Sequence, residues 1–218
     1  MKNIIEIYKE YNLMPNLQEH QLRVAAVVKI ICDNITTPVN SEIIVIAGLL
    51  HDMGNIIKFD LEYFPELNKP EGLDYWLSIQ KEYIQKYGED EHKATIVIMK
   101  ELEVNPEIVR LVDSMSFRNL CDQATSEDFS VKIIQYADMR VGPYGVLSYE
   151  DRMIEGIKRY KNHKKLHNAI QEDERKRFIA CGAEIENQIF AKCKIKPEDI
   201  NDESVGLVID TLREFVLK

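Results

Sequence analysis

Four residues of the chain have side chains that suit a metal site: His20, the adjacent pair His51-Asp52, and Asp138. Each lies on, or at the end of, an apolar stretch with helical spacing. Imidazole and carboxylate groups are the usual mixed ligands of Mn, Fe, Co, Ni, Zn or Mg ions. Two His and two Asp would leave open positions on a six-coordinate ion, and these can take water and a substrate oxygen.

The His51-Asp52 doublet is the most informative part of this set. It follows Gly48-Leu49-Leu50 in the most apolar segment of the chain, where an unpaired carboxylate would be costly to bury. A metal ion, or a Lys or Arg partner, would offset that cost. A single His on an apolar helix is more often a hydrogen-bonded core residue, and a single Asp at a helix end is more often a cap. The complete set therefore carries the prediction, and no single member does.

The segments around these residues read His20-Gln21-Leu22-Arg23-Val24-Ala25, AGLLHDMG over 47–54, and Tyr136-Ala137-Asp138-Met139-Arg140. They resemble the H…HD…D signature of the HD superfamily of metal-dependent phosphohydrolases, over residues 16 to 140. The resemblance implies that His20, His51, Asp52 and Asp138 bind a divalent metal ion, which could be Mn, Mg, Co, Ni, Fe or Zn. The stretch DMRVGPYG over 138–145 is similar to a sub-group of small HD proteins.

The chain departs from the family pattern at two places. Many members have Lys directly after the Gly that follows the doublet, whereas here Asn55 follows Gly54 and the nearest lysine is Lys58. Two-metal members carry additional histidines before the last Asp, but here only His92 is present, and the expected His-His position reads VDSMSF over 112–117. We therefore expect one metal ion, which disfavours a di-iron oxygenase or a two-metal cyclic-dinucleotide phosphodiesterase.

Other polar residues near these segments could act on a phosphate. We expect catalytic roles for Asp52, which could orient or deprotonate a water, for Lys58 as a phosphate contact, and for His92 as a substrate or leaving-group contact. Arg23 follows His20 by one helical turn, so it can point to the same cleft. Arg140 follows Asp138 by two residues, which directs it elsewhere unless the helix has already ended. Either arginine is a candidate for a bidentate phosphate contact. The alternatives are a helix-start histidine without a catalytic role for His92, and salt bridges for the two arginines.

Nearly every segment has the 3.6-residue spacing of a helix, and alternating strand patterns are essentially missing. The expected fold is all-α: a single HD-type helical domain over 1–218, with the signature in 16–140 and additional C-terminal helices in 146–218. Helices are predicted from Asn16, as cap, to about 33, and over 41–50, 71–87 and 90–102. Further helices are predicted from Asn105-Pro106, over 125–138, from Ser148 to 162, over 163–194, and from Asp202, as cap. His163 and His167 have a metal-compatible spacing, but Lys164 and Lys165 favour a solvated face there.

Composition limits the partners. The net charge of −9 disfavours extended nucleic acid as a ligand, and no apolar run is long enough to span a membrane. The N-terminus lacks a signal-peptide pattern, so a cytoplasmic protein is expected. The four cysteines are widely spaced and include no C-x-x-C pair, so we expect lone thiols rather than structural disulfides.

Together these features favour a metal-dependent phosphohydrolase that acts on a phosphomonoester or a nucleotide through a metal-activated water. The alternative is a non-catalytic, regulatory HD module that binds a metal or a nucleotide with the same residues. The expected partner is a small phosphorylated metabolite or nucleotide, and a homodimer is compatible with the sequence.

Overall fold

The computed structural model describes residues 2–161 and 171–217, and throughout these ranges the named elements are helices. Extended backbone pairs there only as isolated bridges, such as Asn3 with Val216. The all-helical prediction is therefore confirmed. The α-helices are α1 (Ile4–Glu10), α2 (Pro15–Asn34), α3 (Ser41–Leu50), α4 (Leu73–Tyr87), α5 (Glu91–Glu101), α6 (Pro106–Ser114), α7 (Leu120–Thr125), α8 (Phe129–Asp138), α9 (Tyr149–Arg159), α10 (Glu172–Phe190) and α11 (Asp202–Arg213). Short 3-10 helices are η1 (Asn55–Lys58), η2 (Pro65–Asn68), η3 (Phe117–Asn119) and η4 (Pro197–Asp199).

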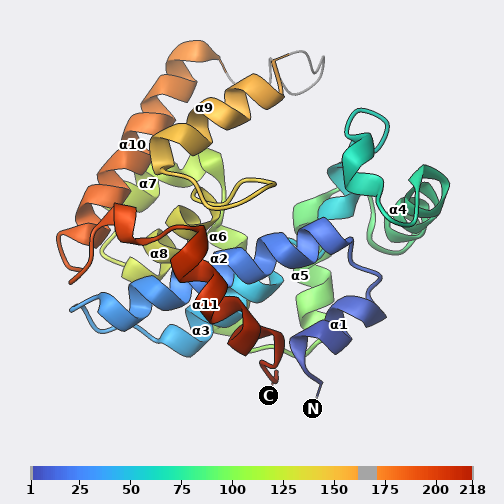
Figure 1. Cartoon of the computed structure of the whole chain (residues 1–218), viewed down its shortest axis with the longest axis horizontal. Coiled ribbons are helices and arrows are strands. Elements are labelled where there is room, and N and C mark those ends of the chain that lie inside the picture. The colour runs from blue at the N-terminus through green and yellow to red at the C-terminus, as the bar shows by residue number, and fades with distance from the viewer. Residues whose placement is uncertain (1, 162–170, 218) are drawn as a thin grey trace.

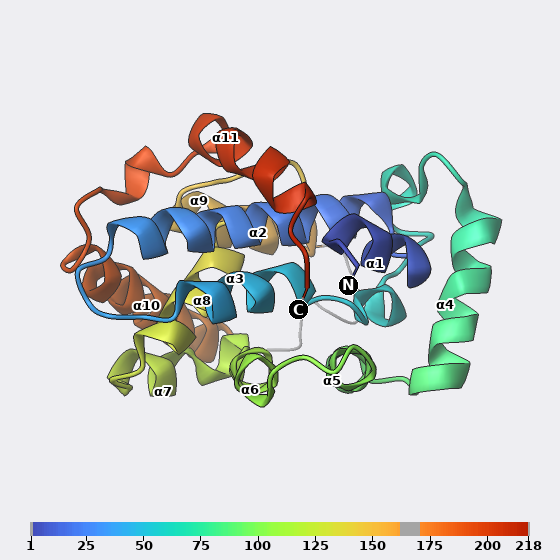
Figure 2. The same ribbon diagram turned by 90° about the horizontal axis from the view of Figure 1, so that it is seen from below.

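The centre of the molecule is the pair α2 and α3. Figure 2 shows α2 running across the middle with α3 beside it, α11 on one side, and α5 and α6 on the other. Eight of the ten residues of α3 are buried, as its almost uniformly apolar sequence predicts. The two helices approach closely at Gly48, where a Cβ would lie 3.0 Å from the Cα of Ala25. This pair forms the support for the doublet that follows α3.

The two ends of the chain meet beside α2. Helix α1 was not among the predicted helices. Asn3 caps it: the Asn3 side chain accepts from the Glu6 N–H, and the Glu6 side chain accepts from the Asn3 N–H. The Ile4 N–H then donates to the Phe215 carbonyl over 2.9 Å, so α1 lies next to the C-terminal segment (Figure 1). Because α11 also packs on α2, the C-terminal residues cover the same helix that carries His20.

Several predicted helix boundaries hold and others are wrong. The helix starts predicted at Asn105 and Ser148 are confirmed, since both residues cap their helices, and α4 ends before Gly88, whose φ of 89° favours glycine. Asn16 is not a cap, because Pro15 already occupies the first turn of α2 and Met14 precedes it without a side-chain bond. The helix predicted over 125–138 begins later, because Thr125 is the last residue of α7 and Asp128 caps α8. The last helix is capped by Asn201 rather than Asp202.

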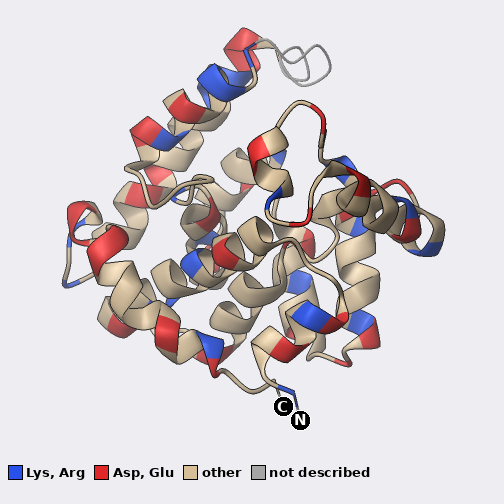
Figure 3. Ribbon diagram, turned by 45° about the vertical axis from the view of Figure 1, so that its right-hand side comes forward, with Lys and Arg blue, Asp and Glu red and all other residues tan. Residues whose placement is uncertain are grey.

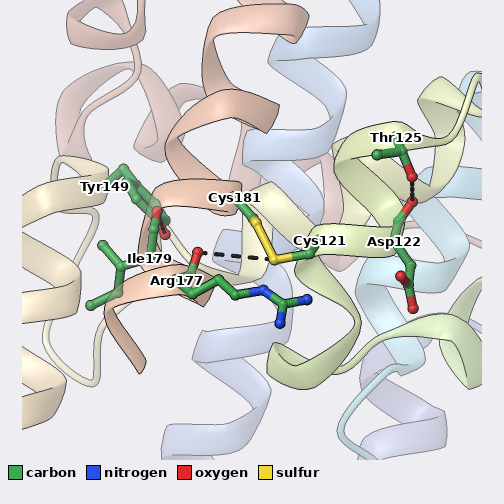
Figure 4. The surroundings of a disulfide bond; sticks show 7 residues. All are labelled: Cys121, Asp122, Thr125, Tyr149, Arg177, Ile179 and Cys181. Carbon is green, nitrogen blue, oxygen red and sulfur yellow. Dashed lines mark hydrogen bonds between the residues drawn. A yellow bond between two sulfur atoms is a disulfide. The ribbon is translucent and has the colours of Figure 1, made fainter. Parts of the chain in front are cut away.

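A disulfide joins Cys121 of α7 to Cys181 of α10 (Figure 4). The expectation of four unpaired thiols is therefore wrong for these two, while Cys32 and Cys193 are free. The pair is 60 residues apart in sequence, and only the packing of α7 against α10 brings it together. On its other side α10 contacts α9, where the Tyr149 hydroxyl donates to the Ile179 carbonyl over 2.9 Å.

The surface carries both signs of charge. In the view of Figure 3, Lys and Arg are interspersed with Asp and Glu over the helices. None of the helices in the described ranges is both long and apolar enough to cross a membrane. The treatment of 1–218 as one domain stays a prediction, although α10 and α11 pack directly on α8 and α2.

The disulfide can be tested by counting thiols. Alkylation of the denatured, unreduced protein should modify two cysteines, Cys32 and Cys193, and reduction should expose the other two. Replacing Cys121→Ser should lower the free energy of unfolding by roughly 2–4 kcal/mol, because the cross-link restricts the unfolded chain. The control Cys193→Ser should cost less than about 1 kcal/mol. Four reactive thiols in the unreduced protein would contradict the pairing.

Candidate metal centre

Three central helices bring the predicted ligands together. His20 lies on α2, His51 is the C-cap of α3 with Asp52 next to it, and Asp138 is the last residue of α8. Because α2, α3 and α8 all contact one another, residues 118 positions apart in sequence meet at one point. The donor atoms of His20, His51 and Asp52 all lie within 4.8 Å of one another.

The distances between donor atoms fit a shared ion. His20 Nε2 lies 3.3 Å from His51 Nε2, 3.6 Å from Asp52 Oδ2 and 3.1 Å from Asp138 Oδ1. His51 Nε2 lies 3.7 Å from Asp52 Oδ2 and 3.5 Å from Asp138 Oδ1. Donors bound at about 2.1 Å from one ion would lie roughly 3.0 Å apart at right angles and roughly 3.4 Å apart at tetrahedral angles. The cluster therefore needs only small adjustments to hold a divalent cation.

Hydrogen bonds aim the doublet at this point. The His51 Nδ1–H donates to the Gly48 carbonyl over 2.9 Å, which leaves Nε2 directed at the cluster. The Asp52 N–H donates to the side-chain oxygen of the buried Gln21 over 3.0 Å, and the Asn55 amide donates to Asp52 Oδ2. Asn55, the departure from the family pattern, is thus a support for the Asp52 carboxylate.

The turn after the doublet is fixed by contact with α5. The Gly54 N–H donates to the Thr95 hydroxyl over 2.9 Å. A Cβ on Gly54 would lie 2.4 Å from the Glu91 carbonyl oxygen, so only glycine permits this approach. The doublet is therefore held between α2 on one side and α5 on the other.

The neighbouring side chains shift the pKa values of His51 and Asp138. Burial of His51 opposes its charged form, but Asp52 and Asp138 outweigh burial and raise the pKa of His51 to about 9. Burial alone would raise the pKa of Asp138, yet hydrogen bonds from His20 and His51 hold it well below its usual range. In the metal-free protein a proton on His51 therefore supplies positive charge that a metal ion would otherwise supply.

A pocket of about 970 Å³ opens from this cluster, and six of the predicted site residues line it: His20, His51, Asp52, Lys58, His92 and Asp138. Two ion pairs lie on its wall. Lys58 Nζ is 3.7 Å from Glu91 Oε1, and His92 Nε2 is 3.3 Å from Asp113 Oδ1. The structure thus brings the predicted ligands and both predicted auxiliary residues to one cavity.

The two arginines predicted to contact phosphate are not among the residues that line the pocket. Arg23 is half-buried on α2. Arg140 is only 2% exposed and donates to the Tyr136 hydroxyl over 2.6 Å, to the Ile200 carbonyl over 2.8 Å, and to the Leu147 carbonyl. The guanidinium thus connects the end of α8 to the segments that precede α9 and α11 by hydrogen bonds. This position does not support a substrate contact. His163 and His167 lie outside the described residues.

Sequence reasoning missed the part of the pocket that α9 and α10 supply. Arg152, Gly156 and Arg159 line the pocket from α9, and Arg175 and Ile179 line it from α10. The spacing of Arg152, Gly156 and Arg159 places them on one helical face, which is the signal that could have identified them.

Metal binding should release a proton from His51. The ion requires a neutral imidazole, whereas a pKa of about 9 keeps His51 protonated at lower pH in the metal-free protein. Calorimetry of Mn²⁺ binding in buffers of different ionisation enthalpy should show about one proton released at pH 7.5. The apparent affinity should fall as pH falls below about 9, by roughly tenfold per unit.

The variant His51→Ala should lose both the binding and the proton release, while His92→Gln should keep both. An affinity for Mn²⁺ that does not change between roughly pH 7 and pH 8.5 would contradict this coupling.

The HD domain family model matches residues 17–139, which is more than half of the chain and includes all four candidate ligands. No curated protein and no solved structure matched the sequence. The match agrees with a geometry in which the two histidines and the doublet carboxylate form one metal-binding cluster. The chain therefore belongs to the HD-domain family.

Proposed function

We propose that this protein is a metal-dependent phosphohydrolase that hydrolyses a phosphomonoester or a nucleotide. The observation that carries the proposal is the cluster of two imidazole nitrogens and two carboxylates at the end of a pocket large enough for a small organic phosphate. HD domains are typically metal-dependent phosphohydrolases, and this chain retains the His and Asp residues of the signature. We assign one divalent ion to His20, His51, Asp52 and Asp138, because the described part of the chain offers no second cluster of this kind.

The donor set suits a catalytic ion better than a purely structural one. A structural site is usually closed by four protein ligands, often thiolates, whereas two histidines and two carboxylates facing a pocket leave room for a substrate oxygen. When bound, a divalent ion supplies Lewis-acid activation of a water and of the phosphoryl oxygen.

Asp52 is the residue we assign as the base. Its Oδ2 faces both histidines and accepts from Asn55, so the carboxylate is held in one orientation by its neighbours. It accepts the proton of the attacking water as the new P–O bond forms. Asp52 thus has two roles, as a ligand and as a proton acceptor.

His92 is the residue we assign as the proton donor to the leaving group. The Asp113 carboxylate lies 3.3 Å from His92 Nε2 and orients the imidazole on the pocket wall. As the ester P–O bond breaks, a proton passes from the imidazole to the leaving oxygen. Lys58, paired with Glu91, is placed on the same wall of the pocket to balance charge on the phosphate.

The assignment of Asp52 can be tested by separating metal occupancy from turnover. The wild-type protein is first screened with Mn²⁺ against phosphomonoesters and nucleotides to find a substrate. In Asp52→Asn, saturating Mn²⁺ should restore occupancy by mass action while turnover stays lower by on the order of 10²–10⁴, because the base is gone. His92→Gln should keep the metal and lose turnover. The control Asp33→Asn removes an exposed carboxylate paired with Lys29 and should leave both unchanged.

Two results would count against this mechanism. Recovery of the wild-type rate in Asp52→Asn at saturating metal would show that Asp52 is only a ligand. A wild-type protein that binds Mn²⁺ but hydrolyses nothing in a broad panel would favour the non-catalytic binding module.

A further inference from the structure

The pocket extends well beyond the metal centre, into a part of the chain that the family model does not match. Its far wall is formed after residue 139, by Arg152, Gly156 and Arg159 of α9, Tyr160 at the end of that helix, and Arg175 and Ile179 of α10. A volume of about 970 Å³ is far larger than one phosphate group requires. The far wall therefore faces the remainder of any bound substrate.

The charged residues that line this pocket divide by sign along the sequence. Among the described lining residues, all the carboxylates precede residue 139: Asp52, Asp60, Glu91, Asp113 and Asp138. The charged residues that line it after that position are arginines: Arg152, Arg159 and Arg175. The carboxylates of the metal centre suit a metal cation, and the arginines of α9 and α10 suit an anion.

Arg152 and Arg159 are held in place for such a role. Glu155 lies between them, with Oε2 3.1 Å from Arg152 Nη1 and Oε1 3.0 Å from Arg159 Nε. The Arg152 Nε–H also donates to the Val141 carbonyl over 2.9 Å. A Cβ on Gly156 would lie 3.1 Å from Arg152 Nη1, so glycine keeps the space beside that guanidinium open.

The two guanidinium groups retain a net positive charge in a partly enclosed place. Their side chains are 20% and 22% exposed, and in the described part of the chain Glu155 is the carboxylate within ion-pair distance of either. Two arginines and one glutamate leave a single positive charge, and a charge removed from water is costly unless it is paired. An anionic ligand group would complete this arrangement.

Much of the remaining pocket wall is apolar. Phe59, Phe64, Leu67, Met153 and Ile157 line it, and the rings of Phe64 and Tyr160 meet edge to face at 5.8 Å across the two sides. Such a surface suits the organic body of a ligand rather than a second hydrated ion.

We infer that Arg152 and Arg159 are specificity-determining residues that bind a second anionic group of the substrate. The substrate is then an organic phosphate in which an apolar body separates the group at the metal centre from a second phosphate or carboxylate. This inference rests on the proposed function for the reacting end, but the α9 contacts can be measured by binding alone.

The test compares ligands that differ only in the second anionic group. The Mn²⁺-loaded protein is titrated by calorimetry with α,ω-alkanediol bisphosphates of increasing length and with the matching alkyl monophosphates. ω-Phosphoalkanoates of the same lengths distinguish a carboxylate from a phosphate. At the best length, the wild-type protein should bind the doubly anionic ligand on the order of ten- to a hundredfold more tightly than the monophosphate.

Arg159→Gln should remove most of this preference while leaving the monophosphate affinity and the Mn²⁺ stoichiometry unchanged. Arg159→Lys should restore part of it, because the charge returns without the planar fork of donors. The control Arg110→Gln alters an arginine outside the pocket, paired with Asp128, and should have no effect. Thermal unfolding of each variant separates loss of binding from loss of the fold.

The inference is overturned if the wild-type protein shows no preference at any length, if it binds none of the ligands, or if Arg159→Gln weakens both ligand types equally. These outcomes do not depend on turnover. A protein that prefers the bisphosphate but hydrolyses no phosphate ester would retain the α9 anion site and lose the proposed hydrolase activity.

Discussion

Two carboxylates meet two imidazoles at the point where the C-terminal ends of α3 and α8 reach α2. The C-terminal ends of both helices add partial negative charge to that of Asp52 and Asp138. A cation is therefore favoured at this site. In the metal-free protein a proton on His51 supplies positive charge there, because Asp52 and Asp138 raise the pKa of His51 to about 9 despite its burial. A divalent ion would supply more positive charge at the same site. The imidazole nitrogens and carboxylate oxygens already lie 3.1 to 3.7 Å apart, which suits such an ion.

Much of the surrounding structure serves to hold this point. α3 is apolar on all sides because it passes through the core. His51 and Asp52 follow its last residue and line the pocket. Gly48 permits the close approach of α2 to α3, and Gly54 permits the close approach of α5 to the turn after the doublet. The hydrogen bonds that hold the doublet and this turn come from Gln21, Asn55 and Thr95. The C-terminal helices then add a wall with the opposite charge, anchored to the rest by Arg140 and by the Cys121–Cys181 disulfide. The pocket is thus built from two parts of the chain with different electrostatic roles.

The sequence was sufficient to identify the four residues that cluster as candidate metal ligands and to predict most helices, because both depend on local patterns. The apolar run of α3 and the residue pairs at its end could be interpreted without tertiary information, and caps such as Asn105 follow from local backbone needs. The pairing of Cys121 with Cys181 could not be predicted, since it depends on the packing of helices 60 residues apart. Arg140 was misjudged for a related reason: α8 ends at Asp138, and the Arg140 side chain points to the C-terminal segment, whereas its neighbours Met139 and Val141 line the pocket. Arg152 and Arg159 were overlooked because their significance lies in the cavity they share with distant residues.

The central claim is that one ion lies between α2, α3 and α8. Anomalous diffraction from crystals of the Mn²⁺-loaded protein, recorded on both sides of the manganese absorption edge, locates the ion directly. The account predicts a single strong peak per chain within about 2.0–2.3 Å of His20 Nε2, His51 Nε2 and oxygens of Asp52 and Asp138. A second peak of equal strength beside His92 and Asp113, or a single peak away from the four ligands, would contradict it.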